Sequence, residues 1–475
     1  MIQKFLFFGL IFVIFLLPAT DPDFGWQLRC GQQFLTTGQI CAKNTFSVLL
    51  PNYEWAYPIL VYPAILAFAF ESFGFWGLSA LNALVITAAY AFLFHSIKNN
   101  NFQKMVFLLI VIPLSWVVFS LGFRSQIFSV LFFTITLFII SKIRGGKSRF
   151  GFFLPPLFLI WANTHGGLVF GFLLLLILIA EQLYQKRWQV SLQTTLLLIS
   201  SFLASLINPF GFRIYKEVLI HSQVPLKTLI AEWVPPSPLH FAFLTFILLI
   251  LFSSVLFSLI NQKRALPVFP LLSACVFILL ALLARRNLPF AYFSLIFLYF
   301  ESHFPSLFST KKSLPFFLPT SLLMIGILIV VFLSLPKTQR LNTNWQAFCD
   351  ESSVVYPCQA VEFLKKQKIK GNIYNTYEWG GFLIWQLPEF KVFVDGRMPA
   401  WLHSSGKSPY TLFLEIIQRQ PGWDKSLRTY KIKWLLIQNG TFLDLELQKS
   451  ASRRTKDWIK EVYRDKTAVV YSVLK

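Results

Sequence analysis

Long apolar runs separated by short polar segments make up the first 335 residues of the chain. The first run, Ile2 to Ala19, has a single Lys4 ahead of it and no small-residue cleavage site after it, so it predicts an uncleaved helix rather than a signal peptide. Further runs near the length that a ~30 Å hydrocarbon core needs lie at residues 56–96, 104–120, 125–142, 151–165, 167–183, 192–207, 240–261, 266–284, 288–303 and 314–335. The pattern predicts a polytopic α-helical membrane protein.

Three basic linkers set the expected orientation of these spans, at residues 142–147, 185–187 and 262–264. Lys and Arg concentrate in short cytoplasmic loops. All three linkers reach that side when residues 56–96 form one crossing plus a re-entrant or interfacial piece. This interpretation gives about 11 transmembrane helices, a cytoplasmic N-terminus and an outer C-terminus. Two helices within 56–96 would reverse everything downstream unless another segment also changes, and up to 13 spans would then be counted.

The composition changes after Leu335. Residues 336–475 predict a soluble α/β domain, which the expected topology places outside the cytoplasm. Period-2 apolar segments predict strands, and amphipathic segments predict helices. The strands are expected at 372–377, 391–394, 434–437 and 468–473, and the helices at 357–367, 410–419 and 424–431. We therefore expect a transmembrane domain at 1–335, with its first outer loop at 20–55, and an extracytoplasmic domain at 336–475.

Composition supports the membrane assignment, because 55% of residues are hydrophobic and only 13% are charged. These values exclude a soluble globular protein and a disordered one. The net charge is +22, but the basic residues are scattered among apolar spans, so topology explains them better than nucleic-acid binding does. Four of the five cysteines form two close pairs in outer segments, Cys30 with Cys41 and Cys349 with Cys358. Two local disulfides and four free thiols both fit this spacing.

An acidic pair, Asp21 and Asp23, directly follows the first span. Two carboxylates at the membrane surface can bind a divalent cation such as Mg²⁺ or Mn²⁺, or one can act as a general base on an acceptor hydroxyl. A turn or helix cap explains the same residues, because Asp-Pro-Asp is common turn chemistry.

Several other polar groups fall on the expected outer side. Arg124, Arg213, Arg285 and Arg286 are candidates for binding an anion, since guanidinium groups bind phosphate in a bidentate manner. Snorkelling to lipid head groups is the alternative. Glu232 lies in another outer segment.

Two further groups of residues carry candidate chemistry. His165 lies in the polar break Asn163-Thr164-His165-Gly166-Gly167, where it is either a hydrogen-bond donor to substrate or a buried structural histidine. In the C-terminal domain Trp379, Asp395 and Arg397 are candidate acceptor-binding residues, and a local contact between Asp395 and Arg397 is the alternative. The sequence contains no nucleotide-binding or serine-hydrolase motif.

These blocks resemble bacterial polytopic membrane proteins related to the GT-C superfamily of lipid-linked-sugar glycosyltransferases, including the glycosyltransferase 39 group. The family's first outer loop reads roughly D-x-D-x-W-W-H-L-x-x-G, followed by D-x-F-S and a Trp. The matching residues are Asp21, Asp23, Trp26, Leu28, Gly31, Phe46, Ser47, Glu54 and Trp55. Gly25 replaces the first Trp of this pattern, Gln27 replaces its His, and Asn44 stands where the later Asp is expected. Similar blocks recur at 124–126, 161–167, 208–211, 232–233, 286–287, 375–381 and 393–397, so the resemblance covers almost the whole chain.

The resemblance implies an enzyme of the bacterial inner membrane. A polyprenyl-phosphate sugar would enter from the outer leaflet, and Asp21 or Asp23 would activate an acceptor hydroxyl or hold a metal that does so. Trp26, Arg124, His165, Glu232, Arg285 and Arg286 would bind the lipid phosphate or the sugar, and the outer domain would bind a glycan, lipid or protein acceptor. No cofactor follows with certainty.

Three other functions remain open at the level of sequence. The altered Trp and His positions favour a non-catalytic scaffold that binds lipid or polysaccharide. A polysaccharide polymerase or ligase of another membrane fold is the second. A transporter is the third, although no pseudo-repeat is evident.

Overall fold

The computed structural model describes residues 2–57, 60–98, 101–223, 230–238, 267–301, 344–351, 354–368, 370–401, 406–453 and 458–474. The chain divides into two compact units. The first, which we call the helical unit, takes residues 1–17, 79–212 and 225–337. The second, the mixed unit, takes residues 18–78, 213–224 and 338–475.

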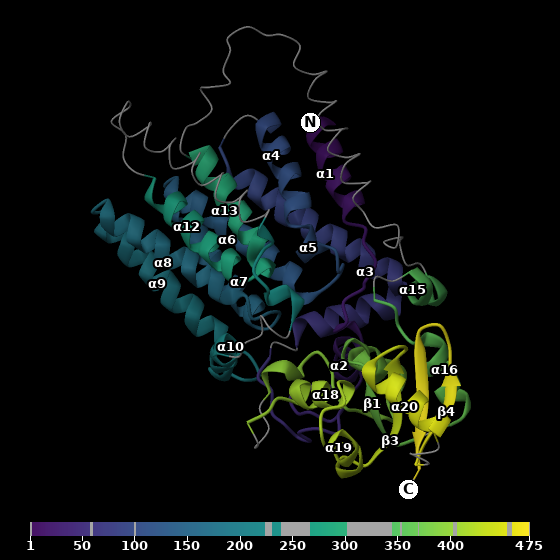
Figure 1. Cartoon of the computed structure of the whole chain (residues 1–475). Coiled ribbons are helices and arrows are strands. Elements are labelled where there is room, and N and C mark those ends of the chain that lie inside the picture. Colours follow the sequence, from purple (N-terminus) through teal and green to yellow (C-terminus); the bar gives the residue numbers. More distant parts are fainter. Residues whose placement is uncertain are drawn as a thin grey trace. The chain divides into compact units, whose positions relative to one another are not determined.

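The described part of the helical unit consists of helices at the expected apolar runs (Figure 1). They are α1 (Ile2–Ile14), the later part of α3 (Val61–Ser96), α4 (Asn101–Leu114), α5 (Trp116–Phe119), α6 (Ser125–Arg144), η1 (Ser148–Phe153) with α7 (Leu154–Ala162), α8 (Leu168–Tyr184), α9 (Trp188–Ser205), α12 (Val268–Leu283) and α13 (Leu288–Glu301). The expected spans 240–261 and 314–335 and the linker 262–264 lie outside the described residues.

Contacts between helix termini show which helix ends lie together at one end of the helical unit. Arg144 at the end of α6 pairs with Glu181 near the end of α8 and with Glu301 at the end of α13. Lys104 near the start of α4 donates to the carbonyl of Phe94 near the end of α3. We call this end of the unit, where Lys98, Lys104, Lys142, Arg144 and Arg187 lie, the basic end. Arg124 directly precedes the 20-residue helix α6, so it lies about 30 Å along the helix axis from Arg144. We call the end of the unit where Arg124 lies the arginine end.

Helix α3 explains the long apolar run at 56–96. It is kinked at Gly74, whose φ of 61° falls in the left-handed region that glycine tolerates best. The part before the kink belongs to the mixed unit and the part after Leu78 belongs to the helical unit. The number of crossings that residues 56–96 make, and the total for the chain, stay predictions. Among the described residues, α3 and α6 are long and apolar enough to span a membrane.

The mixed unit contains a five-stranded sheet with the strand order β2-β1-β3-β5-β4 (Figure 1). Its strands are β1 (Asn372–Asn375), β2 (Lys391–Val392), β3 (Ile432–Gln438), β4 (Ile459–Arg464) and β5 (Ala468–Val473). Strand β1 runs parallel to β2 and β3, and β5 runs antiparallel to β3 and β4. Helix α16 (Cys358–Lys366) precedes β1. The later helices, which lie between the strands, are η6 (Tyr377–Trp379), α17 (Gly380–Gln386), η7 (Met398–Ala400), α18 (Pro409–Ile417), α19 (Trp423–Thr429) and α20 (Phe442–Arg453).

The sequence missed three of these elements. Strand β4 is an edge strand whose side chains are mostly exposed and charged, so it has no apolar alternation to recognise. Helix α17 begins with two glycines and has only seven residues, which favours a turn in a sequence-based interpretation. Helix α20 mixes charged and apolar positions with little periodicity.

Residues 18–57 pack with the C-terminal domain rather than forming a loop of the transmembrane domain. They contribute α2 (Phe24–Thr37), and α10 (Arg213–Gln223) and α15 (Trp345–Glu351) belong to the same unit. The amide of Val48 donates to the carbonyl of Val392 at 2.9 Å, and the amide of Val392 donates to Phe46 at 3.1 Å. The open edge of short strand β2 is thereby paired by the chain after α2. Disulfides join Cys30 to Cys41 and Cys349 to Cys358.

Candidate functional site

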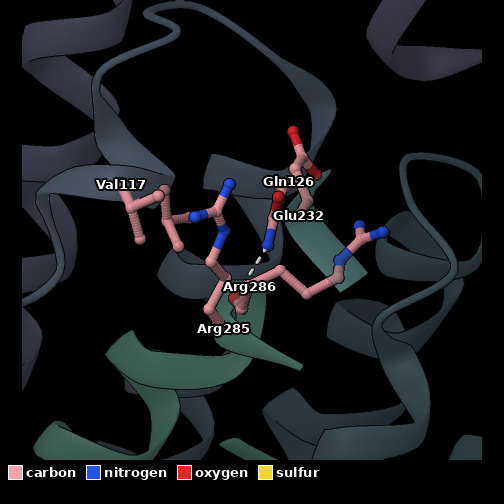
Figure 2. Close-up of a pocket in the computed structure, with 6 residues that line it drawn as sticks. Val117, Gln126, Glu232, Arg285 and Arg286 are labelled. Atoms are coloured by element: carbon pink, nitrogen blue, oxygen red, sulfur yellow. Dashed lines mark hydrogen bonds between the residues drawn. The ribbon is translucent and has the colours of Figure 1, made fainter. Parts of the chain in front are cut away.

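The first cluster of polar side chains lies at the arginine end of the helical unit, and we call it the arginine cluster. Arg124 is the extended residue before α6, Glu232 lies in the short helix η3 (Ala231–Trp233), and Arg285 and Arg286 lie in η4 (Arg285–Asn287) between α12 and α13. The side-chain amide of Gln126 donates to the Arg286 carbonyl at 3.0 Å. Figure 2 shows the labelled side chains of Gln126, Glu232, Arg285 and Arg286 around one small hollow.

Ion pairing dominates the arginine cluster. Arg124 binds Glu232 through both guanidinium Nη atoms, with Nη2 at 3.1 Å from Oε2. The Arg286 guanidinium lies over the Trp233 ring at 4.7 Å from its centroid. The Nε atom of Arg285 is buried and has no acceptor within the described residues. Burial alone would raise the pKa of Glu232, but the charges of Arg124 and Arg286 outweigh it and lower the pKa to about 2. Glu232 is therefore ionised and surrounded by an excess of positive charge.

His165 joins this cluster in one defined orientation. Its Nδ1 accepts the amide N–H of Gly167 at 3.1 Å and lies 2.7 Å from the Ser129 hydroxyl. The indole N–H of Trp161 donates to the same hydroxyl at 2.8 Å, so the Ser129 proton is directed to Nδ1. Since Nδ1 accepts, the proton of the neutral ring is on Nε2. His165 also lies close enough to Arg124 and Arg286 to interact with their charges.

The glycine after this turn has a packing role. A Cβ on Gly167 would approach the Ser129 hydroxyl to 2.5 Å, well inside van der Waals contact. Only a glycine at 167 leaves room for the hydroxyl that orients His165.

The second cluster lies in the mixed unit around Asp21 and Asp23, and we call it the aspartate cluster. Asp21 is buried, and its Oδ1 accepts the Asp23 amide at 3.1 Å, which is the expected turn. Asp23 occupies the residue before α2 but makes no side-chain cap. Its Oδ1 instead accepts the Trp26 indole N–H at 2.9 Å. Asp23 is half-buried, so it is the more accessible carboxylate of the pair.

Glycines allow the backbone to close around Asp23. A Cβ on Gly25 would overlap the Gly381 carbonyl of α17, and one on Gly396 would overlap the Asp23 carboxylate. Helix α2 therefore packs directly on the backbone of α17. No side chain larger than that of glycine fits at position 25.

The residues expected to bind the sugar acceptor form hydrogen bonds and an ion pair with other residues of the chain. Arg397 and Asp395 are both buried and form a bidentate ion pair, with Nε–Oδ1 at 2.8 Å and Nη2–Oδ2 at 2.7 Å. The Arg397 guanidinium also donates to the Asn44 side chain at 3.2 Å. Buried Trp379 donates to the Val355 carbonyl. The local contact that the sequence left as an alternative is the arrangement that the structure shows.

An aromatic enclosure completes the surroundings of Arg397. The rings of Trp26, Phe46, Trp55 and Trp401 have centroids 5.1–5.9 Å from its guanidinium carbon. Cation–π contacts at such distances contribute about 0.5–2 kcal/mol each. Arg397 therefore links residues 26–55 to the C-terminal domain as a structural residue.

The aspartate cluster offers a cation few ligands. Within the described part of the chain, no third Asp, Glu, His or Cys side chain completes a set with Asp21 and Asp23. Each Oδ1 already accepts an N–H group. The described residues therefore do not form a dedicated metal centre around Asp21 and Asp23.

The structure brings together most of the expected residues in two groups. Arg124, His165, Glu232, Arg285 and Arg286 share the arginine cluster, whereas Asp21, Asp23 and Trp26 share the aspartate cluster. The convergence of the two clusters on one ligand stays a prediction. Arg213 pairs with exposed Glu54 in the mixed unit at 3.0 Å, and a role for it in anion binding stays a prediction.

Sequence reasoning missed the residues that orient this chemistry. Ser129 is one polar residue in an apolar helix, and its only signal is that it lies about one turn after Arg124 and Gln126 on α6. Trp161 lay inside a family-like block but had no assigned contact. Asn44 was noted only as a departure from the family pattern.

The fold is similar to that of known membrane enzymes. It resembles ArnT from Cupriavidus metallidurans bound to undecaprenyl phosphate, with a TM-score of 0.56 and 12% identity over 98% of this chain and 96% of that one. It resembles the oligosaccharyltransferase AglB from Archaeoglobus fulgidus, in complex with an inhibitory peptide and a dolichol-phosphate, with a TM-score of 0.53 and 10% identity over 92% of this chain and 70% of AglB. It also resembles the mycobacterial arabinofuranosyltransferase AftD, with a TM-score of 0.53 and 13% identity over 99% of this chain but 41% of AftD.

These similarities, at 10–13% identity, show that the chain shares the fold of these proteins. The shared fold extends over 92–99% of this chain. No family model matches the chain, and no curated protein matches its sequence.

Proposed function

We propose that this protein is a membrane glycosyltransferase that moves a sugar from a polyprenyl-phosphate donor to an extracytoplasmic acceptor hydroxyl with inversion. The observation that carries the proposal is the arginine cluster, where three guanidinium groups and one oriented imidazole surround a single carboxylate. Such a site recognises a phosphate group. Structures of similar fold contain undecaprenyl phosphate and dolichol-phosphate, which supports the same class of donor here.

In this proposal the Glu232 carboxylate occupies the position on the Arg124 guanidinium that the donor phosphate takes when it binds. Its carboxylate presents two oxygens to the Arg124 fork, as a phosphate would. The donor phosphate replaces it on Arg124, and the buried Nε of Arg285 gains an acceptor. The Nε2–H of His165 donates to a further phosphate oxygen. The leaving group is thus stabilised as its negative charge grows.

The transfer itself needs one base. The acceptor oxygen forms a bond to the sugar C1 while the bond from C1 to the phosphate oxygen breaks, and polyprenyl phosphate leaves with the bonding electrons. Asp23 takes the acceptor proton, because it is the accessible carboxylate and Asp21 is committed to the turn. Burial raises the pKa of nearby Tyr377 far above its usual range, and the Asp23 charge raises it further. The phenol therefore stays protonated beside the base.

A substitution at Asp23 tests this role. We expect Asp23→Asn to abolish sugar transfer from undecaprenyl-phosphate sugars in membranes while polyprenyl-phosphate binding is kept. Asp350→Asn, at an exposed carboxylate of the same unit, is the matched control. Full transfer by the Asp23→Asn protein would overturn the base assignment.

A non-catalytic protein that binds polyprenyl phosphate is the second candidate. It is favoured by Gln27, which replaces the family's His and whose buried Oε1 has no donor among the described residues. This candidate predicts that the wild-type protein binds the lipid phosphate and transfers no sugar. Arg124→Gln weakens binding in either case, so the transfer assay distinguishes the two.

A further inference from the structure

A second polar cavity lies at the basic end of the helical unit, about 30 Å along α6 from Arg124. Its volume is about 210 Å³. The side chains that matter come from the ends of α3, α6, α8 and α13 and from the start of α9, and they are Lys98, Arg144, Glu181, Gln182, Arg187 and Glu301. The proposed function assigns no role to this cavity.

The two carboxylates of the cavity both pair with Arg144. Glu181 accepts both Nε and Nη2 of Arg144 at 2.8 and 3.0 Å and the amide of Phe269 at 3.1 Å. Glu301 accepts Nη1 of Arg144 at 3.0 Å. The group of one guanidinium and two carboxylates has one net negative formal charge, and Lys98 and Arg187 outweigh it. The lining therefore has one net positive charge, which favours an anionic ligand.

Two cations and one amide oxygen supply the unused binding capacity. Lys98 and Arg187 are exposed at the rim, and neither has an acidic partner within the described residues. Gln182 is 4% exposed, and its Oε1 has no donor in the part of the chain that the structure describes. The cavity thus combines positive groups that can bind an anion with a buried acceptor, Gln182 Oε1, that can accept a hydrogen bond from a ligand.

We propose that this cavity binds the head group of a phospholipid from the adjacent leaflet, one that carries a hydrogen-bond donor beyond its phosphate. Lys98 and Arg187 bind the phosphate, and Gln182 Oε1 accepts from an ethanolamine ammonium or a glycerol hydroxyl. Basic pockets between transmembrane helices recognise lipid head groups in this way. The volume corresponds to about seven waters at ~30 Å³ each, so the cavity is larger than a single water or ion needs.

The size of the cavity and its need for a hydrogen-bond donor on the ligand distinguish specific head-group binding from general attraction of lipid to surface charge. Phosphatidylcholine has the same phosphate but no hydrogen-bond donor on its head group. Inorganic phosphate has the charge but no acyl chains. Lys147 is basic and exposed at the same end but does not line the cavity, so it provides a matched control for the cationic side chains.

The test uses the full-length protein in neutral detergent. Native mass spectrometry and thermal unfolding are followed with phosphatidylethanolamine, phosphatidylglycerol, phosphatidylcholine or inorganic phosphate added. We expect retention and stabilisation by the first two lipids, and weaker binding of phosphatidylcholine. Arg187→Gln should lower the affinity about five- to tenfold, and Lys147→Gln should change it less than twofold. Gln182→Leu should remove the preference over phosphatidylcholine while leaving binding of the phosphate.

Three outcomes overturn the proposal. Equal losses in Arg187→Gln and Lys147→Gln would show that only surface charge attracts lipid. If the wild type bound phosphatidylcholine as tightly as phosphatidylethanolamine and phosphatidylglycerol, Gln182 would not accept a hydrogen bond from the head group. Displacement of lipid by inorganic phosphate, with the same dependence on Arg187, would assign the cavity to a soluble phosphate instead. Unfolding temperatures without lipid identify a variant that is merely misfolded, and Lys98→Gln then repeats the test. None of these results depends on sugar transfer.

Discussion

Replacing Glu232 by Gln should make the arginine cluster bind polyprenyl phosphate more tightly. In the structure the Glu232 carboxylate occupies the Arg124 fork, and its side chain is 23% exposed. An incoming phosphate must break this ion pair before it can take the fork. Gln keeps the shape of the side chain but removes the charge that holds it there.

The pKa of Glu232 sets the size of this effect. It is lowered from 4.5 to about 2, and at 1.36 kcal/mol for each tenfold change the surrounding charges favour the ionised form by about 3 kcal/mol. A pKa lowered by about 2.5 corresponds to a factor of about 300, so removing that competition would strengthen phosphate binding by at most about 300-fold. Because a neutral amide still hydrogen bonds to Arg124, we expect a gain of about 10-fold to 100-fold.

The assay is the binding of undecaprenyl phosphate to the purified protein in nanodiscs. Glu389→Gln, at an exposed carboxylate of the mixed unit, is the control and should leave the affinity unchanged. Weaker binding by Glu232→Gln would refute the competition and assign Glu232 to direct contact with the ligand, as a sugar-binding acid would be. No change would show that the phosphate does not use the Arg124 fork.

Three further predictions concern the mixed unit and the residues around it. Gly25→Ala should lower the stability by about 1–3 kcal/mol, seen as earlier thermal unfolding, because its Cβ overlaps the backbone of α17; Gly9→Ala, which meets nothing within 4 Å, should not. Arg397→Met should cost about 3–5 kcal/mol by leaving Asp395 charged and buried, and Asp395→Asn in the same chain should recover part of that loss. Burial raises the pKa of Asp444, but the hydrogen bonds from a guanidinium and a phenol outweigh it and lower the pKa to about 2. Its stabilising effect is therefore complete above about pH 4 and is lost as the pH falls toward 2, so the stability difference between wild type and Asp444→Asn should shrink over that range in unfolding titrations.

The sequence predicted the helices well, because an apolar run of sufficient length has few alternatives in a membrane. Helix α6 begins at Ser125 and α8 ends at Tyr184, within a residue or two of the expected spans. The long run at 56–96 was ambiguous, because hydropathy does not distinguish a kink at Gly74 from a loop between two crossings.

The candidate site was predicted as residue types rather than as contacts. Arg124 was expected to bind an anion, but its present partner, Glu232, lies 108 residues away in the chain. Ser129 orients His165 across 36 residues, and no local pattern links the two. The same limit applies to Arg397, which was expected at a ligand site and is instead enclosed by aromatic rings, three of which come from distant residues 26, 46 and 55.

Hydropathy and charge alone were enough to establish the class of protein, the approximate helix positions and the presence of acidic and basic groups on one expected side. These properties depend on local composition, which burial in lipid constrains strongly. Three other properties emerge only in the tertiary structure. They are which carboxylate stays accessible, which arginine pairs with Glu232, and at which position only glycine fits. Each of those outcomes depends on the distance between residues far apart in the chain, and packing sets that distance.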